Sequence, residues 1–235
     1  MDFNNTHFSL SLEALKDSSF FKDIDTQALE NLLSTMSRSS WCKGTFKNGN
    51  EISTHLYFIT SGRLKMYQIN PRSGREHTIM ILTKGDVFDI MCMMDSDAHD
   101  IYYEAIDEME IVFVPISDMQ LWVAQNPAMN RSIFAYLGKR VRQLEEVASS
   151  ICLNNTLVRL SNLLLNNIND KSNELEIIDN LPNNEIASLI GTTRAVVNRH
   201  LQELKNYGAI SLNRKHIYVE KIAVLQSISK EAYII

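Results

Sequence analysis

The sequence has 235 residues and a net charge of −5, with 45% hydrophobic and 22% charged residues. This is the composition of a globular protein, and two small domains suit the length better than one large domain. No apolar run approaches the ~20 residues of a membrane span, so no membrane partner is expected. The N-terminus also lacks the basic start and apolar stretch of a secretory signal.

Three cysteines lie far apart in the sequence, at Cys42, Cys92 and Cys152. None belongs to a CxxC pair, which argues against a zinc knuckle, an iron–sulfur cluster or a disulfide scaffold. Unpaired cysteines fit a reducing compartment, so we expect a cytoplasmic protein. An enzyme on a cupin-like barrel would need clustered His and carboxylate ligands, and no H-x-H pattern occurs. We therefore expect no catalytic centre, no metal site and no cofactor.

The charges are unevenly distributed along the chain. From Asn155 onward there are nine Lys or Arg and eight Asp or Glu, a balance of +1, which leaves −6 for the preceding part. Residues 192–215 hold five basic residues and one acid, whereas residues 86–118 hold ten acids and no Lys or Arg. The first of these segments suits phosphates, and the second repels them.

A helix followed by several short strands is predicted for the first part of the chain. The stretch "DIDTQALENLLSTM" has apolar residues at helical spacing. Between residues 41 and 115, aromatic and β-branched runs such as "HLYFI", "RLKMYQI", "HTIMIL" and "MEIVFVPI" are separated by turn sequences. Short strands at such close intervals predict a compact antiparallel barrel or roll.

A long helix is predicted over residues 126–155, with Asn126 as its N-cap and Pro127 at its first position. Apolar residues along it alternate spacings of four and three, as in a coiled-coil seam. They are Leu137, Val141, Leu144, Ala148 and Ile151. Polar residues flank this seam, which favours a homodimer. A helix that packs only on its own barrel is the alternative.

Further on, "TLVRLSNLLLNNI" predicts another helix and "ELEIID" a strand. Two short helices then follow on either side of Gly191, which can adopt the positive φ that ends the first of them. Thr192 is the expected N-cap of the second helix. The residues expected to be buried between the two helices are Ile186, Ala187, Ile190, Val197, Leu201 and Leu204. This spacing is that of a helix-turn-helix, and "AISLNRKHIYV" after it is typical of a wing.

The second helix also has a polar face that no core needs. Arginine suits guanine, asparagine suits adenine, and the backbone N–H groups at a helix N-terminus can bind a phosphate. The predicted DNA-contacting residues are Thr192, Thr193, Arg194, Ala195, Asn198, Arg199, Gln202 and Lys215. A merely solvated face is the alternative, but the local positive charge, the wing and the dimer seam favour double-stranded DNA. His200 is expected to be packed rather than to read a base.

Together these segments resemble the Crp/Fnr family of bacterial transcription regulators over nearly the whole chain. The stretch from "HLYFI" to "KGDVF" resembles the β-roll of the family, with Gly62, Gly74 and Gly85 at its turns. The long helix resembles its dimerisation helix. In "IASLIGTTRAVVNRHLQEL", the order Thr-Arg-X-X-Val-X-Arg is typical of its recognition motif.

The resemblance implies an α+β fold with a jelly-roll-like sensor domain (1–125), a dimerisation helix (126–153) and a winged helix-turn-helix (154–235). It also implies a homodimer on a roughly palindromic operator, with RNA polymerase as a partner, and Arg194 and Arg199 as contacts to bases and phosphates. The family commonly has Glu where this chain has Ala195, which can offer only a methyl group to thymine. The half-site known for other members should therefore not be assumed.

The effector pocket departs further from the family. Members that bind cyclic AMP carry Gly-Glu-Leu after the Gly-Asp turn and an Arg about ten residues later; here Asp89 begins the first element and Asp100 lies near the place of the arginine. The candidate pocket residues are Asp89, Ile90, Met91, Cys92, Asp100 and Ile101. We expect an unknown effector other than a cyclic nucleotide, or none, and a buried, inert thiol at Cys92. A cyclic-nucleotide-responsive regulator and a β-roll interaction protein that does not bind DNA are the alternatives.

Overall fold

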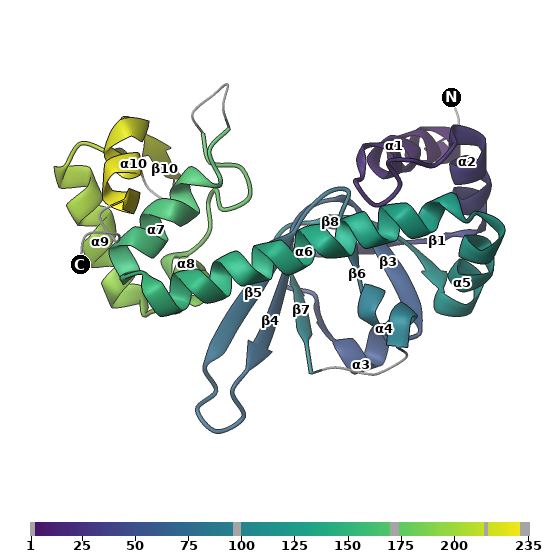
Figure 1. The fold of residues 1–235 in the computed structure, drawn as a ribbon, viewed down its shortest axis with the longest axis horizontal. Coiled ribbons are helices and arrows are strands. Elements are labelled where there is room, and N and C mark those ends of the chain that lie inside the picture. The colour runs from purple at the N-terminus through teal and green to yellow at the C-terminus, as the bar shows by residue number, and fades with distance from the viewer. Residues whose placement is uncertain (1–2, 96–99, 170–173, 214–215, 231–235) are drawn as a thin grey trace. The chain divides into compact units, whose positions relative to one another are not determined.

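The computed structural model describes residues 3–95, 100–169, 174–213 and 216–230. The chain forms two compact units, one of residues 1–75 and 79–141 and the other of residues 76–78 and 142–235 (Figure 1). Within the described ranges, no helix is long and apolar enough to cross a membrane.

The elements of the first part of the chain are a set of short strands with helices before, between and after them. In chain order they are α1 (Phe3–Asp17), α2 (Thr26–Thr35), β1 (Ser37–Trp41), β2 (Phe46–Asn48), α3 (Gly49–Ile52), β3 (His55–Ser61), β4 (Leu64–Ile69), β5 (Glu76–Leu82), β6 (Val87–Phe88), α4 (Ile90–Asp95), β7 (Tyr102–Ala105), β8 (Met109–Pro115), α5 (Ile116–Gln125) and α6 (Ala128–Leu153). The predicted helix at residues 23–36 is confirmed as α2, and the four quoted strand runs are confirmed as β3, β4, β5 and β8.

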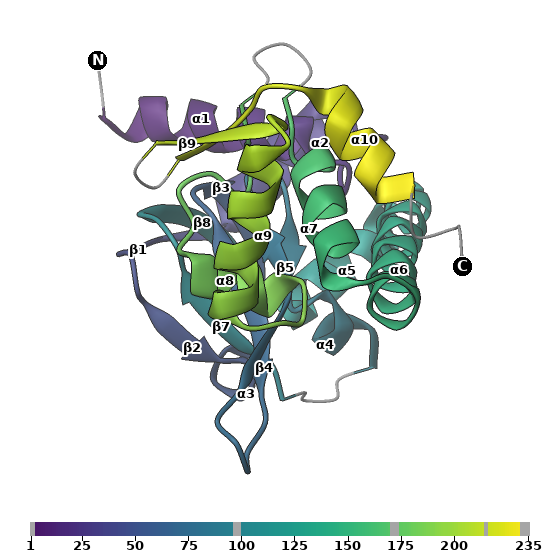
Figure 2. The same ribbon diagram turned by 90° about the vertical axis from the view of Figure 1, so that its left-hand side faces the viewer.

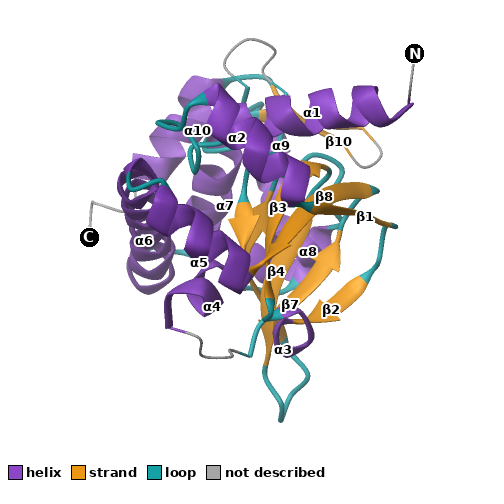
Figure 3. Cartoon of the chain, turned by 90° about the vertical axis from the view of Figure 1, so that its right-hand side faces the viewer, coloured by secondary structure: helices purple, strands orange, loops and turns teal. Residues whose placement is uncertain are grey.

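The strands form two four-stranded sheets with the orders β1-β8-β3-β6 and β2-β7-β4-β5. Strand β8 pairs antiparallel with both β1 and β3, and β7 pairs antiparallel with both β2 and β4. This is the antiparallel roll that the short apolar runs predicted. Helices α4, α5 and α6 lie along one side of these strands (Figure 3).

The central strands β3 and β8 are buried on both faces. In β3, Tyr57 and Ile59 belong to the core between the sheets, whereas Leu56 and Phe58 pack against a second core that includes α1, α2 and α6. Two buried faces require apolar residues at successive positions, and this explains the nearly unbroken apolar runs of the sequence.

Two predictions of local structure were wrong. The segment "ELEIID" is not a strand: Glu174 and Leu175 make isolated bridges, and a turn follows. Asn126 does not cap α6, because its side-chain amide donates to the carbonyl of Trp122 and so closes α5, and α6 begins at Ala128. In the first case, Glu174 and Leu175 each pair with a single residue of another segment instead of forming a strand ladder. In the second case, the end of α5 uses the side chain that was predicted to cap α6.

The second unit is built on α7 (Thr156–Leu165), α8 (Asn183–Leu189), α9 (Arg194–Asn206), β9 (Ile210–Asn213), β10 (His216–Val219) and α10 (Ile222–Lys230). Figure 2 shows α9 with α7 beside it and α8 at its N-terminal end. Strands β9 and β10 pair antiparallel as a hairpin, which confirms the predicted wing strands. The core of this unit includes Leu160, Leu164, Val197, Leu204 and Leu225.

In the β-roll of the first unit, Gly62 provides a direct test of close packing between neighbouring segments. Its φ is +87°, and a Cβ added there would lie 2.6 Å from the carbonyl oxygen of Glu108 and 2.7 Å from Cγ of Met109. Gly74 has a φ of +66° with open space around it. Gly74→Ala should therefore cost only the left-handed conformation, about 1–2 kcal/mol. Gly62→Ala adds overpacking and should cost about 2–5 kcal/mol in urea unfolding. Equal losses for the two variants would contradict the close approach at Gly62.

Candidate nucleic-acid interface

The turn between α8 and α9 is closed by Gly191, whose φ is +66°. The amide of Thr192 donates to the carbonyl of Ala187 (2.9 Å), so Thr192 still belongs to the end of α8. The prediction that Thr192 caps the second helix was therefore wrong by one residue. Thr193 is the N-cap, and its hydroxyl accepts a hydrogen bond from the amide of Val196.

Helix α9 is buried on one face and exposed on the other. The predicted apolar residues Val197, Leu201 and Leu204 are buried, as are Ile186, Ala187 and Ile190 around α8. The residues predicted to contact DNA from this helix all lie on the exposed face: Arg194, Ala195, Asn198, Arg199 and Gln202. The structure thus brings the predicted polar residues together on one surface of a single helix, next to the exposed Thr193 and the half-buried Thr192.

Asn198 does not stand alone on this surface. Its side-chain oxygen accepts a hydrogen bond from the side-chain Nδ2 of Asn183, the first residue of α8, over 2.6 Å. This bond holds the carboxamide of Asn198 in one orientation and leaves its N–H groups to donate elsewhere. Sequence spacing gave no sign of this contact, because it joins residues of two different helices that are 15 positions apart in the sequence.

His200 is buried, as expected, with 7% of its surface exposed. Its Nε2 lies 2.8 Å from the hydroxyl of Thr156 on α7, and its Nδ1 lies 3.1 Å from a carboxylate oxygen of Glu203. A carboxylate only accepts, so Nδ1 must carry a proton. The histidine therefore joins α9 to the first residue of α7 instead of facing outward.

Arg159 is a structural residue that the sequence reasoning missed. From α7, its guanidinium donates to the carbonyl of Ile190 (2.8 Å) and to that of Asn154 (3.0 Å). The first of these is one of the carbonyls that a helix end leaves without an intrahelical partner. The only signal was that Arg159 is the single charged residue of "TLVRLSNLLL".

The wing is described along both strands but not at its tip. Ile210 pairs with Val219, and His216 pairs with Asn213. His216 also lies 3.0 Å from a carboxylate oxygen of Asp179, which fastens the wing to the turn before α8. Lys215, the predicted wing contact, lies outside the described residues.

The predicted seam of α6 changes character along its length. Leu137 is partly buried against the core of its own unit, whereas Val141 and Leu144 are 54% and 43% exposed. Ala148 and Ile151 are exposed as well. Packing on its own barrel therefore accounts for Leu137 but not for the rest of the seam.

Phe134 extends this seam and was missed. It is 70% exposed and lies one heptad before Val141, so it continues the same stripe. The spacing of seven residues was the signal that could have identified it.

The candidate effector residues separate into buried and exposed groups. Asp89, Ile90, Cys92 and Ile101 are buried, whereas Met91 is 50% exposed and Asp100 is also exposed. Burial, followed by the charges of Asp89 and Asp95, raises the pKa of the Cys92 thiol, which keeps it protonated and unreactive. Across the described residues, no group of three or more His, Cys, Asp or Glu could hold a metal ion.

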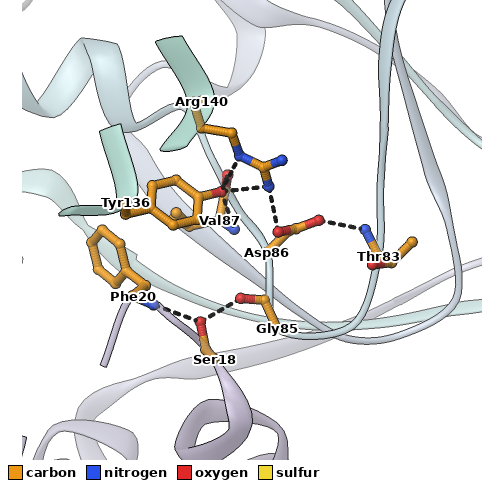
Figure 4. A network of polar contacts seen from close by, with 8 residues as sticks. All are labelled: Ser18, Phe20, Thr83, Gly85, Asp86, Val87, Tyr136 and Arg140. Carbon is orange, nitrogen blue, oxygen red and sulfur yellow. Dashed lines mark hydrogen bonds and ion pairs between the residues drawn. The ribbon is translucent and has the colours of Figure 1, made fainter. Parts of the chain in front are cut away.

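A polar network fastens α6 to the turn that precedes this segment (Figure 4). The guanidinium of Arg140 forms an ion pair with Asp86 and donates to the hydroxyl of Tyr136. That hydroxyl donates to the carbonyl of Val87 (3.1 Å) and accepts from its amide (3.2 Å). The other carboxylate oxygen of Asp86 accepts from the amide of Thr83.

An antiparallel roll, a long helix and a helix-turn-helix with a β-hairpin wing define the class of winged-helix transcription regulators with a β-roll sensor domain. Two domain families match the chain: the Crp-like helix-turn-helix domain over residues 158–228 and the cyclic nucleotide-binding domain over residues 45–126. The chain belongs to the Crp/Fnr family of transcription regulators.

Relatives support this assignment along most of the chain. A global nitrogen regulator of Nostoc sp. is 26% identical over 87% of this chain and 92% of its own length. A CRP-like cAMP-activated global transcriptional regulator of Mycobacterium tuberculosis is 24% identical over 88% of this chain and 94% of its own. A mutant of CooA from Carboxydothermus hydrogenoformans has a similar fold, with a TM-score of 0.71 and 21% identity over 85% of this chain and 90% of its own.

Proposed function

We propose that this regulator is a cytoplasmic homodimer that binds a roughly palindromic operator in double-stranded DNA and acts on RNA polymerase. In this proposal, residues 1–125 form the sensor domain, residues 126–153 the dimerisation helix and residues 154–235 the DNA-binding domain. The observation that carries it is the division of α9 into a buried apolar face and an exposed face with Arg194, Asn198 and Arg199.

Physical chemistry assigns different roles to the residues of this face. Arg194 and Arg199 suit guanine edges or phosphates, and the methyl group of Ala195 suits thymine. Asn198 is held through its oxygen by Asn183, so its free N–H groups favour a base acceptor such as guanine O6 or thymine O4. The N-terminus of α9 at Thr193 presents backbone N–H groups to a phosphate.

The homodimer is supported by the exposed stripe on α6. Val141, Leu144 and Ile151 are large apolar residues that remain exposed in the single chain, and they follow the heptad spacing of a two-stranded coil. A second copy of the same helix would cover them. Dimerisation would also place two copies of α9 on one duplex, as a palindromic operator requires.

The proposed effector is not a cyclic nucleotide. A cyclic phosphate needs a cation or several N–H donors to replace its hydration. The segment 86–118 contains ten acids and no Lys or Arg, and Asp89 in it is buried. The second candidate, a cyclic-nucleotide-responsive regulator, is favoured by the matching cyclic nucleotide-binding domain and by the name of the Mycobacterium tuberculosis relative.

Arg199 is expected to take part in base recognition. Arg199→Ala should weaken binding to a duplex selected by the wild type from a random pool by about 1–3 kcal/mol and relax the preference at one base pair. Arg131→Ala removes an exposed arginine from α6 and serves as the matched control with unchanged affinity. Competition gel shifts measure both. If Arg199→Ala weakened binding to the selected and the random duplexes equally, a role of Arg199 in sequence reading would be refuted.

The exposed apolar stripe of α6 is expected to form the dimer. Val141→Glu with Leu144→Glu places two charges in the apolar seam and should give a monomer in sedimentation, with loss of most DNA affinity. Ala135→Glu with Ser149→Glu adds the same charge at exposed positions one heptad place away from the seam and should remain dimeric. Dimers in both double variants would show that the seam is wrongly assigned.

In a dimer that binds a palindromic operator, the two half-sites should be about one turn of the duplex, ~34 Å, apart.

Cyclic nucleotides are not expected to bind the β-roll. Calorimetry with cyclic AMP or cyclic GMP at millimolar concentration should show no saturable heat, because the pocket segment offers a carboxylate where the phosphate would bind. DNA affinity should be unchanged by either nucleotide. A micromolar dissociation constant for either one would overturn this proposal in favour of the cyclic-nucleotide-responsive alternative.

A further inference from the structure

Asp89 is the most unusual residue of the β-roll. It joins β6 to α4 with a φ of +62°, a left-handed conformation that among the described non-glycine residues only Asn180 shares. An aspartate there is strained, since such conformations favour glycine. The side chain is also buried, with 3% of the residue exposed. Backbone strain and a buried acid therefore coincide at one position.

The carboxyl group is only half satisfied in this position. Oδ1 accepts a hydrogen bond from the hydroxyl of Tyr103 (3.2 Å), whereas the buried Oδ2 has no hydrogen-bond partner. Aromatic rings surround this carboxyl group. The ring of Phe88 stacks on that of Tyr57 with the centroids 4.8 Å apart, and its centroid lies 5.1 Å from that of Tyr103. An ionised carboxylate with one bare oxygen is costly in such a place, whereas a neutral carboxyl is tolerated.

We propose that Asp89 is a proton-binding site inside the β-roll, and that loss of its proton loosens the hold of the roll on α6. The ligand of this site is the proton itself, which leaves to solvent water when the carboxyl ionises. The charged form draws water toward Oδ2 and displaces the segment that begins at Val87.

The groups that face Asp89 do not offset its charge. Burial raises the pKa of Asp89 to about 7, and the hydrogen bond from Tyr103 lowers it only in part. The interacting titratable groups are Tyr57 on β3, Tyr103 on β7 and Cys92 on α4, with Asp95 acting on Cys92. Burial and then the charge of Asp89 raise the pKa of Tyr57 to about 12. All of these groups are neutral or negative near pH 7, so none of them supplies a compensating positive charge.

The connection to α6 is short. Val87 and Phe88 form the whole of β6, and the backbone of Val87 is held by the hydroxyl of Tyr136. Asp86, three residues before Asp89, is the ion-pair partner of Arg140 (Figure 4). Arg140 directly precedes Val141, the first largely exposed residue of the seam after Leu137. A displacement at Asp89 therefore acts on the anchor of the helix that would form the dimer.

The test compares unfolding of the full-length wild type and Asp89→Asn in urea between pH 5 and pH 8. The folded wild type keeps the proton on Asp89 up to about pH 7, whereas the unfolded chain loses it near the ordinary value of about 4. The folded state thus binds more protons in this window, so stability falls as pH rises and levels off above about pH 7. The unfolding constant of the wild type relative to Asp89→Asn should rise by roughly ten- to hundredfold from pH 5 to pH 8.

Asp95→Asn is the matched control. It makes the same substitution at an exposed carboxylate of α4 and should keep the pH dependence of the wild type. The same pH dependence in Asp89→Asn as in the wild type would overturn the proton site. Should Asp89→Asn fail to fold, carbon NMR of the wild-type carboxyl groups decides: a carboxyl that titrates near pH 7 supports the site, and titration of every aspartate below about pH 5 rejects it.

The link to α6 rests on the proposed function and has its own measurement. DNA affinity of the wild type should fall by about fivefold or more from pH 6 to pH 8 relative to Asp89→Asn. If the ratio of the two DNA affinities stayed constant between pH 6 and pH 8 while stability depended on pH, the link to α6 would be rejected and the proton site supported. If the wild type binds no DNA at any pH, the proposed function fails, and the unfolding measurement still decides the proton site.

Discussion

The ion pair between Arg140 and Asp86 fastens α6 to the roll at the point where the buried face of this helix ends. Both side chains are largely withdrawn from solvent, at 16% and 22% exposure, so removal of either would leave a charge without its partner in a poorly hydrated place. Before this pair, Met129, Ile133 and Tyr136 are buried against the roll. After it, from Val141, the apolar stripe of the helix is exposed. The face of α6 that packs on the roll thus ends near this ion pair, whereas the exposed apolar stripe runs from Phe134 to Ile151.

Two of the strands that the sequence predicted, β3 and β8, are buried on both faces. Strands β3 and β8 lie between the two cores, and this demands the long apolar runs by which they were recognised. Strand β1, "SRSSW", pairs only with β8 at the edge of its sheet and has mostly exposed or half-buried side chains. Trp41 is its one buried side chain, and a single apolar residue forms no periodicity by which the strand could be identified. The two-residue β6 is too short for any pattern.

The helix-turn-helix was predictable because local constraints define it. The turn requires the positive φ that glycine adopts at Gly191, and the apolar positions on either side are fixed by helical spacing. What the sequence could not provide is the way other segments use these ends. The amide of Thr192 is bound by α8, which moves the cap to Thr193, and the carbonyl of Ile190 is bound by Arg159 from another helix. Arg159 and Ile190 are 31 positions apart and become neighbours only through packing.

Asp89 is the residue of the roll that argues most directly for the proposed effector, which is not a cyclic nucleotide. A glycine at this position would remove the strain of a left-handed aspartate, about 1–2 kcal/mol, and would also remove the cost of a buried carboxyl. The aspartate side chain that causes the strain and the burial cost has no N–H group and no positive charge, so only its backbone amide could donate to a ligand oxygen. A carboxyl group here can be kept neutral by a proton or satisfied by a hydrogen-bond donor, and a phosphate supplies neither at neutral pH. An anion beside Asp89 would therefore leave this carboxyl without a partner, and on the proposed function the roll keeps its fold but binds a different kind of effector, or none.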